Sequence, residues 1–382
     1  MRRTVYTEDH EAFRDSVRGF VQRDVVPHLE RFREERAIDR KTWLQAGEAG
    51  LLGTGIGERW GGGGEPDFRY NAVVNEELSA VSAALASSFT IHTDIVAPYL
   101  TELTTPEQRD RWLPGFVSGE TVTAIGMTEP SGGTDLAALK TTAVRDGDAF
   151  VLNGSKTFIT NGYGCDLVIV AARTGAPDSR ARGISLIAVE AGAQGFSRGR
   201  KLHKIGQPEA DTAELFFDDV RVPVTNLLGE LDRGFPAMMQ RLAQERLSCA
   251  ISNVAHAAAV FDETLTYIKE RKAFGQPIGS FQANKHRVAD LRTQLDVARA
   301  FVDACLDAHT RGELTAVDAA KAKLWSSEAQ NDVIDACVQL YGGYGYMEEY
   351  RVGRAWADAR VSRIWAGSNE IMREIVGRDL GL

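Results

Sequence analysis

The spacing of apolar residues changes twice along the chain, and the two changes predict three regions. Up to residue 119, apolar residues recur at helical spacing, as at Phe13, Val17 and Phe20. Between residues 120 and 228, short segments of alternating apolar and polar residues are typical of strands. The helical spacing then returns in longer segments. The sequence therefore predicts an N-terminal helical domain (1–119), a central β domain (120–228) and a C-terminal helical domain (229–382).

In the central region the pattern predicts short strands with no helices between them. Such an arrangement favours an antiparallel sheet or barrel. Asp146-Gly147 predicts a hairpin turn, because glycine accepts a positive φ. The predicted strands are 121–125, 149–152, 156–160, 167–170, 184–189 and 213–217.

The two outer regions predict helices of different lengths. The N-terminal region predicts one helix over 71–85 and another that begins at Thr105-Pro106 and runs to Trp112. Long helices joined by short loops in the last region predict an antiparallel four-helix bundle. Its members are expected at 235–271, 282–310, 315–340 and 367–377.

Composition and charge exclude several classes of protein. A net charge of −9 argues against nucleic acid as the main partner, because phosphate binding needs basic patches. No apolar run approaches the roughly 20 residues that span a bilayer, and the N-terminus lacks the features of a secretory signal. The four cysteines show no CxxC pairing, which predicts reduced thiols and a cytoplasmic location. No metal-ligating cluster is predicted.

A glycine- and tyrosine-rich segment, residues 337–370, carries the most information about function. Glycine pairs allow a backbone to turn sharply and to approach a ligand closely. The order of its spaced residues resembles the C-terminal signature of the acyl-CoA dehydrogenases, a family of FAD-dependent enzymes. The matching positions are Gln339, Gly342, Gly343, Gly345, Tyr346, Glu349, Arg354 and Asp358.

Two further segments, in the central region, resemble the same family. The segment 126–135, GMTEPSGGTD, clusters hydroxyls and glycine amides after a strand, as a site for anionic or carbonyl oxygens would. The resemblance implies that Met127 and Thr128 face the flavin pyrimidine ring, and that Thr134 lies near the pyrophosphate and the substrate thioester. In the segment KTFITNG it implies that Phe158 lies against the isoalloxazine and that Thr160 bonds flavin N5. Taken alone, each segment is more typical of an ordinary turn or core strand.

A fourth match, at residues 271–282, implies an assembly. Arg271 suits bidentate phosphate recognition, and Phe274 and Gln282 would contact the adenosine half of FAD. In the family these residues, like 339–343, reach the FAD of a neighbouring subunit, which implies a homotetramer built as a pair of dimers. The full set of FAD-binding residues that the resemblance implies is Ile125, Met127, Thr128, Gly133, Thr134, Phe158, Ile159, Thr160, Arg271, Phe274, Gln282, Gln339, Leu340, Gly342, Gly343, Ser368, Asn369 and Glu370.

One position departs from the commonest family pattern. The best-known members carry their catalytic glutamate where this chain has Ala366, so a base must come from elsewhere. The long-chain and isovaleryl-CoA dehydrogenases carry theirs on a helix, as Glu followed by Arg, which Glu245-Arg246 reproduces. The predicted base is therefore Glu245, with a pKa raised toward neutrality by an apolar site. The predicted substrate-binding residues are Thr134, Leu242, Arg246, Ala366 and Gly367, with Arg246 orienting the loop at 366 and the Ala366 N–H donating to the thioester carbonyl.

The implied reaction is α,β-dehydrogenation of an acyl thioester to the trans-2-enoyl thioester, with an electron-transferring flavoprotein as the acceptor. Three alternatives stay open: a dehydrogenase acting on acyl-carrier-protein thioesters, a flavin oxidase of the same fold, and a catalytically silent flavoprotein. Ala366 favours the silent flavoprotein and Glu245 opposes it. The sequence does not indicate the length or branching of the acyl chain.

Overall fold

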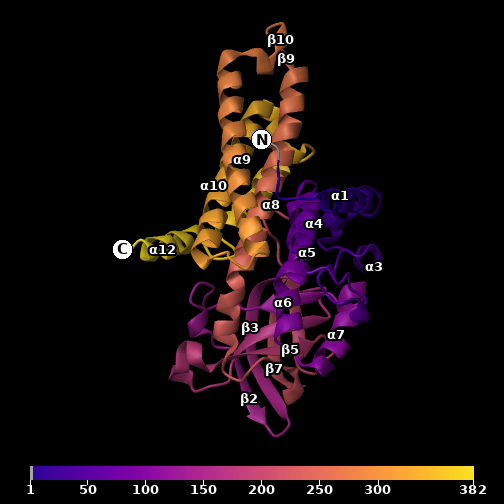
Figure 1. The fold of residues 1–382 in the computed structure, drawn as a ribbon, viewed down its shortest axis with the longest axis vertical. Helices are drawn as coiled ribbons and strands as arrows, with labels where there is room; N and C mark the ends of the chain where they lie inside the picture. Colours follow the sequence, from indigo (N-terminus) through magenta and orange to yellow (C-terminus); the bar gives the residue numbers. More distant parts are fainter. Residues whose placement is uncertain (1–2) are drawn as a thin grey trace.

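The computed structural model describes residues 3–382, and its N-terminal part is helical, as expected (Figure 1). The predicted helix over 71–85 is wrong in one respect. It is two helices, because the chain turns at residues 80–82 and the Ser82 hydroxyl caps the second by accepting from Leu85 N–H at 3.3 Å. The helices here are α1 (Glu8–Phe20), α2 (Leu29–Glu35), α3 (Arg40–Glu48), α4 (Arg69–Ser79), α5 (Ala83–Thr90), α6 (Ala97–Glu102) and α7 (Pro106–Ser118).

Thr105 caps α7 as predicted, but that helix extends to Ser118, well past Trp112. The Thr105 hydroxyl accepts from Gln108 N–H, and the Gln108 side chain accepts from Thr105 N–H at 2.8 Å. The chain changes from helix to strand between Ser118 and Thr123.

The central part forms one sheet in which the strand order is β6-β7-β3-β2-β4-β5-β8, with β1 paired to β4. Most pairs are antiparallel, but β1 and β2 both pair with β4 in parallel, so the sheet is mixed. The predicted strands at 149–152 and 156–160 are one strand, bent by a register shift at Gly154. The strands are β1 (Thr123–Gly126), β2 (Thr142–Asp146), β3 (Ala149–Thr160), β4 (Leu167–Arg173), β5 (Ile184–Glu190), β6 (Phe196–Lys201), β7 (Thr212–Pro223) and β8 (Leu227–Leu228).

Three long helices form the body of the C-terminal part, and their bounds lie within two residues of the predicted ones. The fourth predicted member is the short helix α12, which packs on α10 and projects to the side in Figure 1. A short hairpin joins α8 to α9 at the end of the molecule opposite the sheet (Figure 1). The elements are α8 (Gly234–Glu270), β9 (Lys272–Ala273), β10 (Gln276–Pro277), α9 (Gln282–Thr310), α10 (Ala316–Tyr341), α11 (Arg351–Ala359) and α12 (Asn369–Asp379).

Helix α8 connects the three parts of the chain. Near its N-terminus, Met238 belongs to an apolar cluster that also contains Tyr99 of α6 and Ile169 of β4. Further along, Leu247 and Ile251 pack against residues of α9 and α10. No helix within residues 3–382 is long and apolar enough to cross a membrane.

Candidate active site

The carboxyl group of Glu245 lies buried at the junction of α8 and α6. The residue is 8% exposed, and the Tyr99 hydroxyl, itself fully buried, donates to Glu245 Oε1 at 3.3 Å. Burial raises the pKa of Glu245 to about 7, against the opposing effects of Tyr99, Arg246 and Arg241. A carboxyl with this pKa is ionised about half the time near neutral pH, which suits a proton acceptor.

Two arginines of α8 lie on either side of Glu245 in the sequence, and their surroundings differ. Arg241 forms an ion pair with Glu102 at 2.6 Å and lies over the Tyr99 ring, 5.0 Å from its centroid. Arg246 is 6% exposed, and no acceptor within residues 3–382 bonds its Nε. The Nε of Arg241 also lacks an acceptor among the described residues, so the two arginines differ in the ion pair that only Arg241 forms there.

The loop before α12 holds Ala366 in an unusual backbone conformation. Ala366 has φ +53° and Gly367 has φ +87°, and a positive φ is uncommon for any residue with a Cβ. The positive φ of Gly367 favours glycine, because a side chain there would be strained; the Met372 methyl, 2.7 Å from where a Cβ would lie, is the end of a flexible side chain. No acceptor among the described residues bonds the Ala366 N–H. The loop therefore presents a free backbone donor.

Hydrogen bonds from Lys323, rather than from Arg246, hold this loop. Lys323 Nζ on α10 donates to Gly367 O at 2.7 Å and to Asn369 Oδ1 at 2.8 Å. No hydrogen bond joins Arg246 to residues 364–370 in the described part of the chain, so its predicted orienting contact is not seen. The Asn369 side chain is buried and also bonds Ser327 and Glu328, so any contact of Asn369 with a cofactor would come from its backbone.

A buried ion pair supports the turn at 126–135. The Lys156 ammonium, fully buried on β3, pairs with Glu129 at 2.8 Å and also donates to Met127 O at 3.2 Å. Burial would raise the pKa of Glu129, but Lys156 and the amide of Lys140 outweigh it and hold the value at about 2. Thr128 O accepts from Thr157 N–H at 2.9 Å. These contacts fix the backbone of the two predicted pyrimidine-ring neighbours, while Gly133 and Thr134 stay exposed.

The end of β3 presents an aromatic ring to solvent. Phe158 is 69% exposed at φ +58°, whereas Ile159 beside it is buried in the sheet core. Thr160 is half-buried and pairs with Thr212 of β7. The Phe158 ring therefore does not pack in the core and offers a surface on which a planar ligand could stack.

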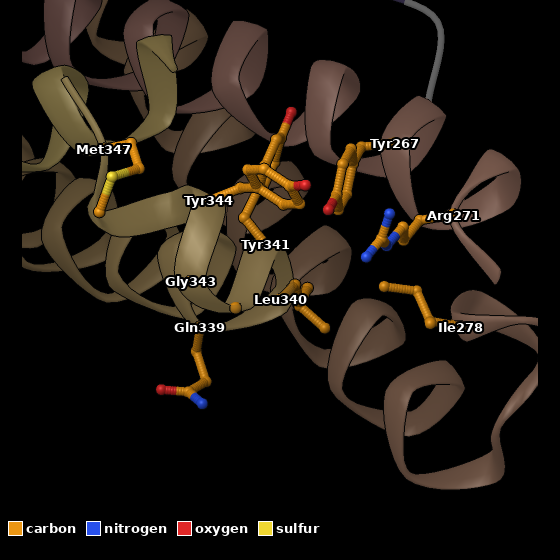
Figure 2. Close-up of a pocket in the computed structure, with 10 residues that line it drawn as sticks. Tyr267, Arg271, Ile278, Gln339, Leu340, Tyr341, Gly343, Tyr344 and Met347 are labelled. Carbon is orange, nitrogen blue, oxygen red and sulfur yellow. The ribbon is translucent and has the colours of Figure 1, made fainter. Parts of the chain in front are cut away.

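A second group of predicted residues meets in a pocket at the far end of α8, shown in Figure 2. The pocket has a volume of about 530 Å³, and Arg271 lies beside Tyr267 at its edge. Tyr267 stacks on Tyr341 with ring centroids 4.0 Å apart, and Arg271 lies over the Tyr344 ring at 5.4 Å. The predicted residues that line it are Arg271, Gln339, Leu340, Gly342 and Gly343.

The hairpin beyond this pocket is highly exposed. Phe274 is 95% exposed at φ +52°, and its nearest aromatic neighbour is Phe281 at 6.1 Å. Gln282, at the start of α9, is also exposed. The structure therefore brings Arg271 together with 339–343, whereas Phe274 and Gln282 do not line this pocket.

The two groups of predicted residues are far apart within one chain. Between Glu245 and Arg271 helix α8 advances about 39 Å at 1.5 Å per residue. Leu242 and Ala366, predicted to bind substrate, are half-buried. The sequence analysis missed two residues: Tyr99, which bonds Glu245, and Lys323, which bonds the loop before α12. The sequence could have indicated Lys323, because it is a lysine among the apolar alanines of α10. No pattern in the sequence marks Tyr99.

Comparisons with known proteins agree with the predicted family. Models of the acyl-CoA dehydrogenase N-terminal, middle and C-terminal domains match residues 7–120, 124–220 and 232–381. The long-chain specific acyl-CoA dehydrogenase of Sus scrofa is 46% identical over 380 residues, which cover 99% of this chain and 88% of that protein. The isovaleryl-CoA dehydrogenase of Solanum tuberosum is 35% identical over 378 residues, covering 98% and 91%.

Among solved structures, an acyl-CoA dehydrogenase from Geobacillus kaustophilus is 43% identical and superimposes over the whole of both chains with a TM-score of 0.97. The three domain matches, the two relatives and this structure all name the family that the motifs indicated. The chain therefore belongs to the acyl-CoA dehydrogenase family of FAD-dependent oxidoreductases.

Proposed function

We propose that the protein dehydrogenates acyl-CoA thioesters between the α and β carbons, with Glu245 as the base. The observation that carries the proposal is the buried Glu245 carboxyl, whose pKa of about 7 suits proton abstraction near neutral pH. Ala366 offers no side-chain base, so the carboxylate has to come from another element.

Each neighbouring group has a part in this chemistry. Glu245 takes the α-proton, leaving negative charge on the thioester oxygen. The free Ala366 N–H donates to that oxygen, where a fixed backbone dipole is most effective. Arg246, whose Nε lacks an acceptor, supplies positive charge on the same side of the site. Tyr99 keeps the Glu245 carboxyl in place through its hydrogen bond.

The residues present fit FAD at the turn 126–135 and the end of β3. Met127 and Thr128 are fixed there by Lys156 and Thr157, and Phe158 offers an exposed ring for stacking. Ile125 lies on β1 and Thr160 lies at the end of β3. Ser368, Asn369 and Glu370 lie at the start of α12. When bound, FAD accepts the hydride that leaves the β-carbon as the double bond forms.

We propose a homotetramer built as a pair of dimers, and the separation along α8 supports a contribution of a neighbouring subunit to each FAD site. A single FAD cannot reach both Glu245 and Arg271, which are about 39 Å apart along the helix. The pocket at Arg271 and the exposed Phe274 therefore serve the FAD of a neighbouring subunit. Light scattering at micromolar concentration tests this arrangement. A monomer that retains FAD would contradict it.

The proposed substrate is a long-chain acyl-CoA, and the proposed electron acceptor is an electron-transferring flavoprotein. The chain-length proposal is supported by the 46% identity to a long-chain enzyme. The cytoplasm is the proposed location, because all four cysteines are free thiols, as a reducing compartment requires.

Anaerobic titration with acyl-CoAs of increasing length tests the proposed reaction. We expect loss of flavin absorbance with long-chain acyl-CoA, and slow recovery in air until an electron-transferring flavoprotein is added. Rapid recovery in air would favour the oxidase alternative. If the flavin absorbance is lost only with acyl-carrier-protein thioesters, the acyl carrier is a carrier protein and not CoA. Absence of bleaching with every thioester would contradict the proposal.

A further inference from the structure

Lys323 is a buried cation without a carboxylate partner. Its side chain is fully enclosed, and no ion pair to it is found among residues 3–382. Burial lowers the pKa of Lys323 and the charge of Arg246 lowers it further, while Cys249, Glu370 and Glu328 partly oppose this decrease. Enclosing an ammonium group is costly unless the site uses it. Packing alone would be better satisfied by an apolar side chain such as methionine.

The two acceptors of Lys323 identify what the ammonium does. They are Gly367 O at 2.7 Å and Asn369 Oδ1 at 2.8 Å, which lie on either side of Ser368. Ser327, one turn further along α10, donates to the same Asn369 oxygen at 3.1 Å. The loop is therefore tied to a rigid helix immediately after Ala366.

The conformation that Lys323 holds is one the loop would not keep unaided. Ala366 has a positive φ, which is strained for a residue with a Cβ, and such strain persists only where surrounding contacts enforce it; the positive φ of Gly367 carries no such cost. The Ala366 N–H has no acceptor among the described residues and belongs to the peptide unit between residues 365 and 366, whereas Gly367 O belongs to the unit between 367 and 368. Fixing that carbonyl therefore restrains the backbone torsions of Gly367 and Ala366, on which the direction of the Ala366 N–H depends.

We propose that Lys323 is a positioning residue for the dehydrogenation: its ammonium anchors Gly367 O and Asn369, and so keeps the Ala366 N–H directed at the thioester oxygen. The inference rests on the proposed function, because that amide acts only if a thioester binds there. Under this proposal the loop before α12 depends on the Lys323 charge on α10, whereas the proposed base, Glu245, lies on α8.

The test compares Lys323→Met, which keeps an unbranched apolar stem, with Ser327→Ala, which removes the two hydrogen bonds between Ser327 and the Asn369 side chain but leaves Lys323 bonded to Gly367 O. Hydrogen exchange of the amides at 364–370, measured on the purified protein, should become faster in Lys323→Met than in Ser327→Ala. With saturating long-chain acyl-CoA, kcat of Lys323→Met should fall about 10²-fold with little change in KM, as for a misplaced oxyanion donor.

A spectroscopic measurement separates positioning from general damage. A 3-thia-acyl-CoA can lose its α-proton but cannot release a hydride, and its deprotonation is followed by long-wavelength absorbance. In Lys323→Met the apparent pKa for that deprotonation should rise by about 1 to 2, because the oxygen that takes the charge has lost an aligned donor. In Ser327→Ala it should stay near the wild-type value.

Several outcomes would overturn the inference: wild-type kcat and exchange in Lys323→Met, or equal effects of the two substitutions. Lys323→Gln, which keeps a hydrogen-bond donor, replaces the methionine variant if that one does not fold, and should show a smaller loss of the same kind. Failure of the proposed function is distinct, since wild-type flavin would then not bleach with any thioester, while the exchange comparison would still report on the anchor.

Discussion

The two ends of helix α8 lie in opposite environments. Near its start, Glu245 is 8% exposed and bonded to a tyrosine of another helix, so one chain builds this end completely. Beyond its last turn, Arg271 borders an open pocket and Phe274 is 95% exposed. Burial raises the pKa of Glu245 at the buried end, whereas the exposed end presents groups to solvent. In the proposed function, a single helix carries chemistry at one end and assembly at the other.

Replacing the proposed base should have the largest effect and should leave the exposed end untouched. In Glu245→Gln we expect flavin reduction to fall beyond the roughly 10²–10⁴-fold usual for loss of a general base, because proton and hydride departure are coupled. FAD and acyl-CoA should still bind. Stopped-flow absorbance measures the rate, and Glu270→Gln, exposed on the same helix, is the matched control. Near-normal reduction in Glu245→Gln would remove Glu245 from the mechanism.

The same substitution should stabilise the fold at alkaline pH. Folding raises the pKa of Glu245 from 4.5 to about 7, so the folded state loses stability as pH rises through this range. Above pH 7 the cost is roughly 3 kcal/mol at most, and Glu245→Gln removes it. The variant should therefore unfold at higher temperature than the wild type at pH 8, with little difference at pH 5. An equal difference at both pH values would show that ionisation of Glu245 is not the cause.

Removing Arg271 tests the exposed end. Arg271→Ala should weaken FAD binding about 10- to 100-fold, the value of a charge-assisted hydrogen bond to phosphate. At saturating FAD the reduction rate should stay near normal, because the buried end is intact. Fluorescence titration of the apoprotein measures the affinity, with Arg292→Ala, exposed on α9, as the control. A lower rate at saturating FAD would erase the distinction between the two ends.

The smallest expected effect concerns Tyr99. Its hydroxyl donates to the ionised carboxylate and so lowers the pKa of Glu245 against the larger effect of burial. The other charges that act on Glu245 are Arg241, which is paired with Glu102, and Arg246. Tyr99→Phe keeps the ring and should shift the pH profile of flavin reduction upward by about 0.5 to 1. An unchanged profile would show that the hydrogen bond is not made in the working enzyme.

Local signals explain which features of the fold could be predicted. The bounds of α8 and the cap at Thr105 follow from periodicity and from side chains close in sequence. The break between α4 and α5 was missed because the apolar spacing continues across it. The parallel pairing of β1 with β4 was missed because it depends on the placement of the intervening hairpin, which no local pattern encodes.

The residues of the candidate site also divide into those that a local sequence motif indicates and those that only the folded chain reveals. Glu245, Phe158 and Ala366 stand in motifs and could be singled out from sequence. Phe158, Phe274 and Ala366 are three of the nine non-glycine residues with positive φ within residues 3–382. A positive φ at such a residue cannot be predicted from its type. Tyr99 is 146 positions from Glu245, and Lys323 is 44 from Gly367, so only the folded chain reveals those contacts.

Placing the base on α8 has an evolutionary consequence for the loop at Ala366. The loop contributes to the proposed reaction through its backbone, and a backbone N–H is present whatever small side chain occupies the position. In the proposed mechanism, proton abstraction is carried by α8, a different element from the loop. Variation at position 366 can therefore reshape the wall of the acyl pocket, and with it the range of accepted substrates, without passing through an inactive ancestor.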